Sequence, residues 1–450
     1  MYSKRGYGMT LSACLWMGLF PLLQCGTYSH ITHDKWVFML ILTGITLLCF
    51  LFDLVFHRHR SFADISRERA RKAFLPLILC TALLLWTILS CIFSESAASV
   101  WWLAEDARME GLLTQLCYFV LFCCFFFSRV HLRPVLFSAA AGVAVFLCIA
   151  LLQRAGGNPL GLYPAGTSYE LNPEFQGTIG NIDMGTGYLL LLSGLFLYAL
   201  LRFLPLPVKK APAQSGETIV KPPTLRTFFP AMIYFAGLLV SIWLIVTMDV
   251  QFGMISLGVL LLVTLFRFLP KRLRLPLLIF LVIVVLLAVW FWPGQSGGIW
   301  ELHEIFHGRA RLSFGSNRVA VWDYSLRMSK GHLLLGGGSG TFTSRFNSFL
   351  SEQGLVIPNE QDGIPLPDYF DNPHNEYLAH LTDHGIPAVL LFIGLLLLSV
   401  YRKRDGLLPL PAPCSAAVLC YMVQAFFSFS VCLVAPMFWV ILALSFTDPV

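Results

Sequence analysis

Charged side chains are scarce in this chain. Aspartate, glutamate, lysine and arginine make up 12% of its 450 residues, which is about half the share found in soluble globular domains. Hydrophobic residues reach 57%, and the mean hydropathy is +0.72. This composition excludes the soluble class and places the chain among membrane proteins.

Two further features are missing. The chain has 12 cysteines, but they lie in or at the edges of apolar runs, which excludes a disulfide framework and a paired CxxC metal site. Charge inside the apolar runs is also rare, since Asp53, Asp183, Asp249 and Arg267 lie near their ends. A proton- or ion-coupled transporter would place more charge at mid-membrane, so this scarcity argues against transport.

Apolar runs long enough to cross a bilayer take up most of the sequence. A spanning helix needs roughly 20 apolar residues, and in lipid its backbone must form its hydrogen bonds internally. The predicted fold is therefore all-α and polytopic, with about twelve spans, the first of them uncleaved. The spans are expected near 9–27, 36–56, 75–93, 111–127, 134–152, 182–201, 229–248, 252–269, 275–292, 379–400, 412–428 and 434–447.

Basic residues concentrate in alternate loops. The alternation starts with Lys4 and Arg5 and includes most of the 31 lysines and arginines, as the positive-inside rule requires. The expected topology places both termini in the cytoplasm and the long loop between spans nine and ten outside. Cytoplasmic anchoring then explains the net charge of +6, and no nucleic-acid partner is indicated.

The longest polar segment divides the chain. Residues 293–376 are enough to form a small extracytoplasmic cap, which separates spans one to nine (1–292) from spans ten to twelve (377–450). Within the cap, Ser316 is expected to cap a helix near 317–330. The apolar face of that helix would carry Val319, Trp322 and Leu326.

Two more local structures are expected at the end of the cap. The run Gly336–Gly340 forms a tight turn whose backbone N–H groups are suited to a phosphate, although the lysine and hydroxyl of a nucleotide-binding P-loop are absent. Asn372 is expected to cap a helix with Pro373 at its first position. That helix would carry His374 and Tyr377 on one side.

His374 is the leading candidate for chemistry. A neutral imidazole can take a proton from a hydroxyl near pH 7. The competing interpretation is a histidine at a helix start that only bonds neighbouring backbone.

Arginines form the second candidate set. Guanidinium groups grip phosphate bidentately, which suits an anionic or diphosphate substrate. The cap arginines are Arg309, Arg311, Arg318, Arg327 and Arg345. Surface ion pairs with the acidic residues of the loop explain them equally well.

Two other groups have weaker patterns. His380 and His384 have the i, i+4 spacing of zinc ligands, but the HExxH order is absent, so a structural role is favoured. Glu105 and Asp106 lie in another outer loop, where a carboxylate pair would suit acid–base work.

Four short motifs carry a resemblance to a known family. They are Arg108 with Gly111-Leu112-Leu113, then Gly177-Thr178-Ile179-Gly180-Asn181, then Arg318 and Trp322 with the stretch Leu335–Phe342, and finally His374-Asn375-Glu376-Tyr377-Leu378 with Gly385. In the order of these motifs the chain resembles the O-antigen ligase and O-antigen polymerase superfamily of bacterial membrane glycosyltransferases.

The resemblance implies a fold like that of C-type glycosyltransferases in the bacterial cytoplasmic (inner) membrane. It implies cell-envelope polysaccharide or lipopolysaccharide biosynthesis, with transfer of a glycan from a polyprenyl (undecaprenyl) diphosphate to a hydroxyl of a glycan, lipid or protein acceptor. No metal and no other cofactor is implied.

The resemblance also implies residue roles. His374 would activate the acceptor, and Arg318 would hold the diphosphate. Arg108, Arg309 and Arg311 are further candidates for the diphosphate, with Asn375, Trp322 and Tyr377 in supporting positions. The chain departs from the family at Gln251, where a second arginine is usual.

Two other functions remain as alternatives. One is a transporter or flippase of lipid-linked oligosaccharide, with the cap as a gate. The other is a peptidoglycan-type polymerase that relies on an outer carboxylate rather than on His374.

Overall fold

The computed structural model describes residues 6–56, 61–104, 108–203, 225–357, 360–361, 364–365, 370–401 and 413–447. Within these ranges the chain is built from helices, and its strands form two short hairpins, β1 (Phe175–Gln176) with β2 (Gly180–Asn181) and β3 (Glu360–Gln361) with β4 (Ile364–Pro365). The predicted all-α, polytopic membrane fold is confirmed.

Each predicted span corresponds to an apolar helix. Among the described residues, 7 helices are long and apolar enough to cross a membrane, and the remaining positions hold shorter apolar helices. The long ones are α2 (Ile31–Phe56), α3 (Ser61–Ile92), α6 (Leu132–Arg154), α7 (Ile182–Leu201), α8 (Leu225–Thr247), α10 (Lys271–Trp290) and α14 (Glu376–Val400). The shorter ones are Tyr7–Leu22, which begins with α1 (Tyr7–Cys14), α5 (Leu112–Phe126), α9 (Gln251–Phe268), α15 (Pro413–Gln424) and α16 (Ala435–Ser445).

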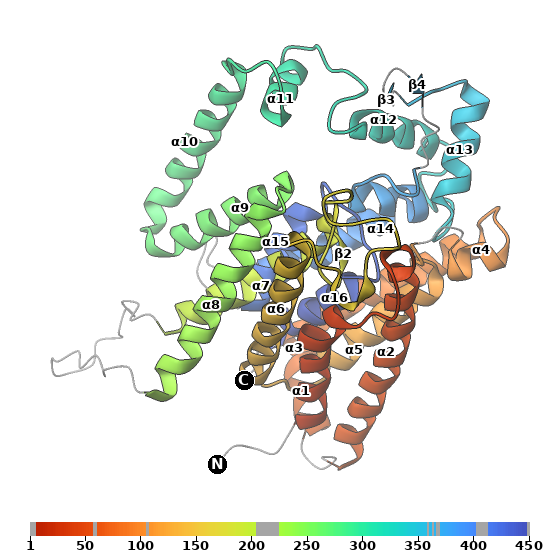
Figure 1. Ribbon diagram of the computed structural model, residues 1–450. Coiled ribbons are helices and arrows are strands. Elements are labelled where there is room, and N and C mark those ends of the chain that lie inside the picture. The colour runs from red at the N-terminus through yellow and green to blue at the C-terminus, as the bar shows by residue number, and fades with distance from the viewer. Residues whose placement is uncertain are drawn as a thin grey trace.

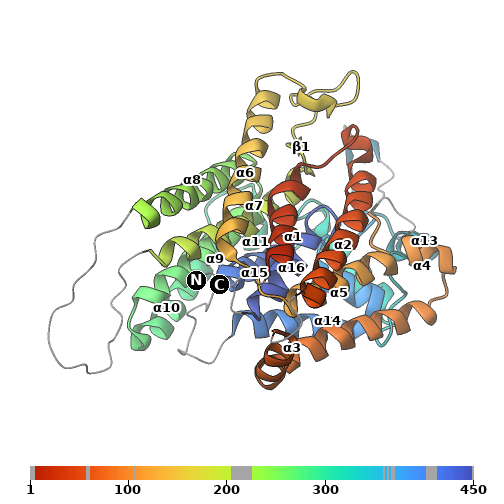
Figure 2. The same ribbon diagram turned by 90° about the horizontal axis from the view of Figure 1, so that it is seen from below.

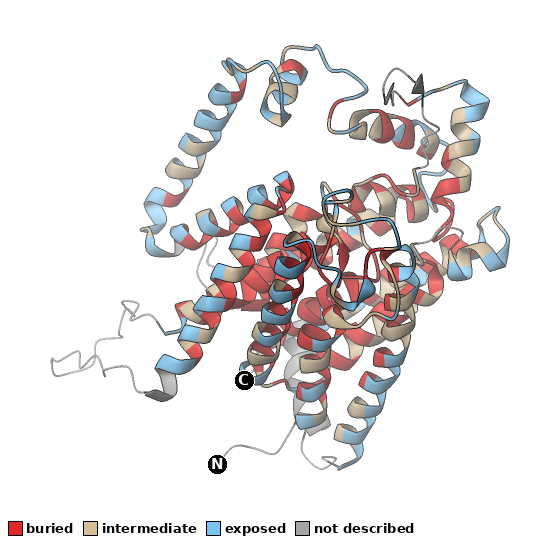
Figure 3. Cartoon of the chain, in the orientation of Figure 1, coloured by how far each residue is buried: buried red, intermediate tan, exposed pale blue. Residues whose placement is uncertain are grey.

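The two shortest apolar spans, α15 and α16, lie inside the bundle rather than at its surface. Every residue of α16 is buried, and α15 and α16 are largely buried in the view of Figure 3. A helix shorter than the hydrocarbon thickness, and the irregular chain at its ends, are tolerated at membrane depth only where protein surrounds them. The burial of α15 and α16 therefore explains their length.

Small residues bring the central helices into close contact. The membrane-spanning window of α7 is 89% buried, and α7 packs against α8 and α15. A Cβ built on Gly194 would lie 2.5 Å from the backbone nitrogen of Ala417, so the two backbones approach too closely for any larger residue at this position. This is the packing by which membrane helices associate without a hydrophobic driving force.

Helix α10 stands apart from the bundle. Only 11% of its spanning window is buried, and it leads outward to α11 (Gly298–Phe306), with which it packs (Figure 1). Its apolar side chains, among them Ile279, Phe280 and Val285, are exposed. An all-round apolar helix of this kind belongs in lipid.

The segment predicted as a cap has a small hydrophobic cluster of its own. It contains α12 (Arg318–Ser329) and α13 (Phe342–Gln353), which pack through Ala320, Val321, Tyr324, Phe342 and Phe346. In Figure 1 α11, α12 and α13 lie at one end of the molecule, and both chain termini lie toward the other end. A short helix, α4 (Ala98–Leu103), lies near the base of α13 in the same view.

The helix expected at 317–330 is present, but its start and its buried face differ from the prediction. Asn317, with φ 66°, precedes the helix and Ser316 makes no cap. The face of α12 that carries Val321 packs against α13. Leu326 is therefore exposed, and Trp322 contacts Pro373 instead. Sequence periodicity fitted both faces, and packing against α13 decided between them.

Candidate active site where the cap meets the bundle

His374 lies in a turn held by two asparagines. The Asn372 side-chain oxygen accepts the His374 backbone N–H at 2.8 Å, and the Asn375 side chain accepts the Leu378 N–H at 3.0 Å and caps α14. The helix predicted to start at Asn372 therefore begins at Glu376, and His374 precedes it with φ 48°. A left-handed conformation at a non-glycine residue costs about 1 kcal/mol or more and occurs preferentially at functional sites.

Two residues of α12, Arg318 and Trp322, lie next to this turn. The Trp322 indole N–H donates to the Pro373 carbonyl at 2.9 Å. Arg318, one turn earlier on the same face, donates from Nη1 to the Gly315 carbonyl at 3.0 Å. Its Nε is buried and has no hydrogen-bond partner, so this guanidinium retains an unused donor beside the His374 turn.

Arg108 approaches His374 from the loop before α5. It donates to both carboxylate oxygens of Asp371, at 2.5 and 3.2 Å, and its guanidinium lies 4.6 Å from the centre of the Phe429 ring. The Phe429 ring and the His374 imidazole make a T-shaped contact, with centroids 5.1 Å apart. Phe429, between α15 and α16, therefore connects Arg108 with His374.

The environment of His374 keeps the imidazole neutral. Burial lowers its pKa, Arg318 and Arg108 lower it further, and Asp371 partly offsets them, so that the pKa is about 4. Its Nδ1 is buried and makes no hydrogen bond. A neutral imidazole is the form that accepts a proton.

A pocket lies beside this turn, with about 590 Å³ of empty space that includes its opening to solvent. Its walls include Arg108, Glu110, Glu376, His380 and Phe429. The pocket therefore reaches from the Arg108 loop to the first turns of α14, where cap, bundle and the 425–434 connection meet.

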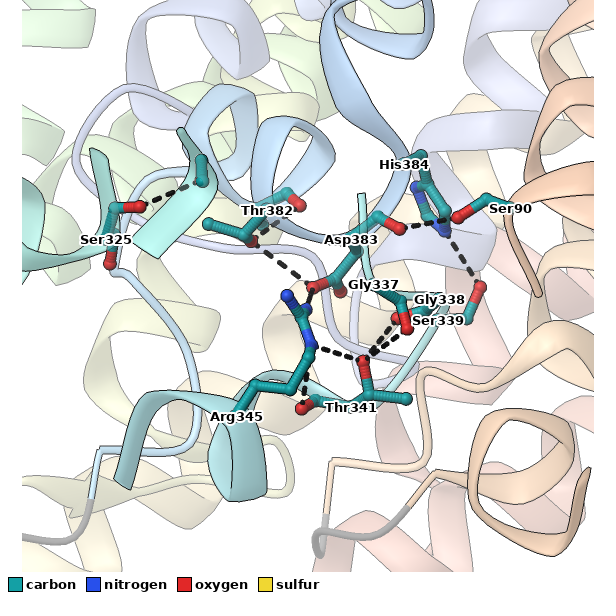
Figure 4. A network of polar contacts seen from close by, with 12 residues as sticks. Ser90, Ser325, Gly337, Gly338, Ser339, Thr341, Arg345, Thr382, Asp383 and His384 are labelled. Carbon is teal, nitrogen blue, oxygen red and sulfur yellow. Dashed lines mark hydrogen bonds and ion pairs between the residues drawn. The ribbon is translucent and has the colours of Figure 1, made fainter. Parts of the chain in front are cut away.

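The glycine-rich segment does not offer its N–H groups to a ligand. The N–H of Gly337 donates to the Thr382 carbonyl at 3.0 Å, and that of Gly338 donates to the Asp383 carbonyl at 2.8 Å. Figure 4 shows this segment on the kink of α14, where Gly385 has φ 78°. The phosphate role considered for Gly336–Gly340 is wrong, because the kink leaves α14 carbonyls that these N–H groups satisfy.

The contact between the glycine-rich segment and α14 also involves Arg345, His384 and helix α3. Arg345 donates to Asp383 at 2.9 Å and to the Thr341 hydroxyl at 2.8 Å. His384 Nε2 and the Ser339 hydroxyl are hydrogen-bonded at 2.8 Å, and Ser90 donates to the Asp383 carbonyl at 2.7 Å. Figure 4 shows these residues as one network, and Figure 2 shows α3 alongside α14. We call this network the α14 clamp.

Two predicted arginines lie elsewhere in the cap. Arg309 makes a double hydrogen bond to Glu304 of α11, at 2.6 and 2.8 Å, and it is half exposed. Arg311 lies near the rings of Trp300 and Phe314. Neither makes a contact with the His374 turn, so their proposed role at the diphosphate stays a prediction.

The position of the usual second arginine is occupied by an amide. Gln251 opens α9, and a Cβ built on Gly298 would lie 2.7 Å from its side-chain oxygen. The start of α11 therefore packs on Gln251. Glu105 and Asp106, the candidate carboxylate pair, lie outside the described residues.

The remaining motif residues have structural roles. The Tyr377 hydroxyl donates to the Met422 carbonyl at 2.8 Å and ties α14 to α15. Asn181 caps α7 by accepting the Asp183 N–H at 2.8 Å, and Asp183 interacts electrostatically with Arg318 and Arg108. Within the part of the chain that the structure describes, no group of three or more His, Cys, Asp or Glu side chains is placed to hold a metal ion.

The segment that carries most of these residues matches a family model. Residues 236–393 match the family described as O-antigen ligase. The chain carries an O-antigen ligase domain. The match starts in α8 and ends in α14, so it includes Arg318, Trp322 and His374, whereas Arg108 lies before it. No curated protein matches the chain.

This match supports the superfamily inferred from the motifs. A domain of this family implies glycan transfer of O-antigen ligase type in the membrane. The multi-pass helical bundle agrees with that location.

The sequence analysis missed two residues close to His374, Asp371 and Phe429. Asp371 lies just before the HNxxL motif and pairs with Arg108, which also acts on His374. A search for acidic residues next to the motif would have found Asp371. Phe429 lies 55 positions after His374 in an apolar stretch, and no local signal distinguishes it from other phenylalanines.

Proposed function

We propose that the protein transfers a glycan from a polyprenyl diphosphate to an acceptor hydroxyl on the outer face of the cytoplasmic membrane. The observation that carries this proposal is the placement of a neutral, buried imidazole next to Arg318 and Arg108 where the cap meets the bundle. The topology inferred from the basic loops places this junction outside.

Each group has one task in the reaction. The acceptor oxygen attacks the anomeric carbon of the donor glycan, and its proton passes to the imidazole of His374. The bond from the anomeric carbon to the phosphate oxygen breaks, and the diphosphate leaves with the bonding electrons. Arg318, which has a free Nε donor, stabilises the negative charge of the leaving group.

Donor binding strengthens the base. Arg318 and Arg108 lower the pKa of His374 in the free protein. A diphosphate bound to Arg318 adds negative charge and offsets their effect, so the pKa of His374 rises toward neutral pH when the donor is present. The imidazole thus becomes a competent base only in the complex with donor.

The proposal is tested by the lipid-linked glycan pool of cells that carry His374→Ala, measured by mass spectrometry. We expect loss of transfer and accumulation of donor. Single outward-facing repeat units would assign the polymerase reaction, and long chains on the lipid would assign the ligase reaction. The exposed His332→Ala variant is the matched control.

A normal glycan pool in His374→Ala cells with intact membrane insertion would refute the role of His374. Units trapped on the inner face would favour the transporter. Loss of transfer in Glu105→Gln or Asp106→Asn, with His374→Ala active, would favour the carboxylate-dependent polymerase.

A further inference from the structure

The pocket beside His374 contains hydrogen-bonding groups that the transfer reaction described above does not use. Glu376 is 4% exposed, lines the pocket, and its Oε2 has no hydrogen-bond partner. His380, one turn along α14, also lines the pocket with an unpartnered, buried Nδ1. Buried polar groups left without partners cost stability, and a ligand that satisfies them recovers that cost.

The pocket is lined by carboxyl groups, whereas the unpaired guanidinium donor of Arg318 lies beside the His374 turn. Four carboxyl-bearing residues line it, namely Glu110, Asp371, Glu376 and Asp383. Arg108 is the guanidinium among the described lining residues, and it already bonds both oxygens of Asp371. A diphosphate is therefore disfavoured in this pocket, because Arg108 and Arg345 are already paired with the pocket residues Asp371 and Asp383.

Aromatic and hydroxyl groups complete the walls. Phe342 and Phe429 present rings, and Ser430 presents a hydroxyl. Because the Phe429 ring also contacts His374, a ligand in the pocket lies next to the imidazole. Apolar walls with a few convergent polar groups are typical of small-molecule sites.

We propose that this pocket is the acceptor subsite and that it binds an uncharged, hydroxyl-rich sugar ring. Ring hydroxyls bond Glu376 and His380, and the hydroxyl to be glycosylated points to His374. The donor diphosphate occupies the Arg318 side of the same imidazole. This inference rests on the proposed function, since it divides the two substrates of that reaction between two sides of His374.

The test measures the two subsites separately on purified full-length protein in detergent. One probe is a panel of neutral methyl glycosides (glucoside, galactoside, mannoside and N-acetylglucosaminide), with binding followed by saturation-transfer NMR. The other probe is farnesyl diphosphate. Glu376→Gln should weaken glycoside binding roughly tenfold, because an amide forms weaker hydrogen bonds to sugar hydroxyls than a carboxyl group does, and leave farnesyl diphosphate binding unchanged. Arg318→Ala should do the opposite.

Controls separate the inference from folding and from the proposed function. Glu352→Gln makes the same chemical change at an exposed site of α13 and should change neither affinity. His380→Gln provides a second variant in the pocket, and both variants should keep the melting temperature of the wild type within a few degrees.

Deoxy analogues of the best glycoside sharpen the assignment. The analogue that lacks the hydroxyl bonded to Glu376 should bind the wild type and Glu376→Gln equally, because it lacks the group on which the substitution acts. A methyl glucuronide should bind the wild type more weakly than the glucoside.

Three outcomes overturn the inference. They are the absence of wild-type binding across the glycoside panel, unchanged glycoside affinity in Glu376→Gln and His380→Gln, and a Glu376→Gln effect on farnesyl diphosphate alone. Unchanged farnesyl diphosphate binding in Arg318→Ala would instead count against the proposed function.

Discussion

Two arginines of the cap, Arg318 and Arg345, have very different surroundings. Arg345 bonds Asp383 and Thr341 in the α14 clamp, where each of its neighbours is also engaged. Arg318 bonds one backbone carbonyl and keeps its Nε unpartnered. The sequence offers both as candidate phosphate ligands, but only the incompletely bonded one has capacity for a substrate. The number of hydrogen bonds already made therefore distinguishes Arg318, which we propose to bind substrate, from Arg345, which stabilises the fold.

The largest effect on the transfer rate is expected from substitution of Arg318. Arg318→Ala should lower the glycan-transfer rate by roughly 10²–10³-fold, because it removes the charge that we propose stabilises the leaving group. The free energy of unfolding should change by less than about 0.5 kcal/mol, as for a residue with few protein partners. Rates are measured with purified enzyme and lipid-linked donor, and unfolding is measured by thermal melts. A stability loss as large as that of Arg345→Leu would contradict the comparison.

Arg345→Leu should mainly lower the free energy of unfolding. Its loss leaves Asp383, which is largely buried, without its ion-pair partner and should cost about 3 kcal/mol of unfolding free energy. The matched control is Arg327→Leu, since Arg327 forms an exposed pair with Asp323 at 2.6 Å and should cost less than about 0.5 kcal/mol. Equal losses in the two variants would show that the clamp is not a stabilising unit.

The pKa of His374 provides a third comparison. Arg318→Gln should raise this pKa from about 4, because it removes a nearby positive charge, whereas Arg327→Gln should leave it unchanged. Since the folded pKa lies below the usual value near 6.5, the unfolded chain binds the proton first. Wild-type stability should therefore fall as the pH drops from about 6.5 to about 4, and less so in Arg318→Gln. NMR titration of labelled histidine and melts across that range measure both.

The smallest effect is expected at Trp322. Trp322→Phe keeps the ring but removes the hydrogen bond to the Pro373 carbonyl, which is worth about 1 kcal/mol. The transfer rate should fall roughly fivefold through misplacement of the His374 turn, without loss of donor affinity. Trp290→Phe, in the exposed α10, should have no effect.

The sequence predicted the helices well because each one is encoded locally by a long apolar run. It also predicted His374 and Arg318 as candidates because both lie in motifs. Helix boundaries near the site were wrong for a reason of tertiary structure. Asn372 and Asn375 are equally good caps, and the bond from Trp322 to Pro373 holds the chain in a non-helical turn until the second. Contacts such as Phe429 with His374 could not be predicted, since no local pattern encodes them.

The α14 clamp joins segments that are made at very different times. The Trp86 indole donates to the His384 carbonyl at 3.0 Å across 298 positions of sequence, and Ser94 bonds the Gly337 carbonyl. At roughly 5–20 residues per second, translation of that interval takes roughly 15–60 s. During this time Trp86 and Ser94 lack the partners that they have in the folded protein. The α14 clamp is therefore completed late in biosynthesis, after the chain up to α14 has been made.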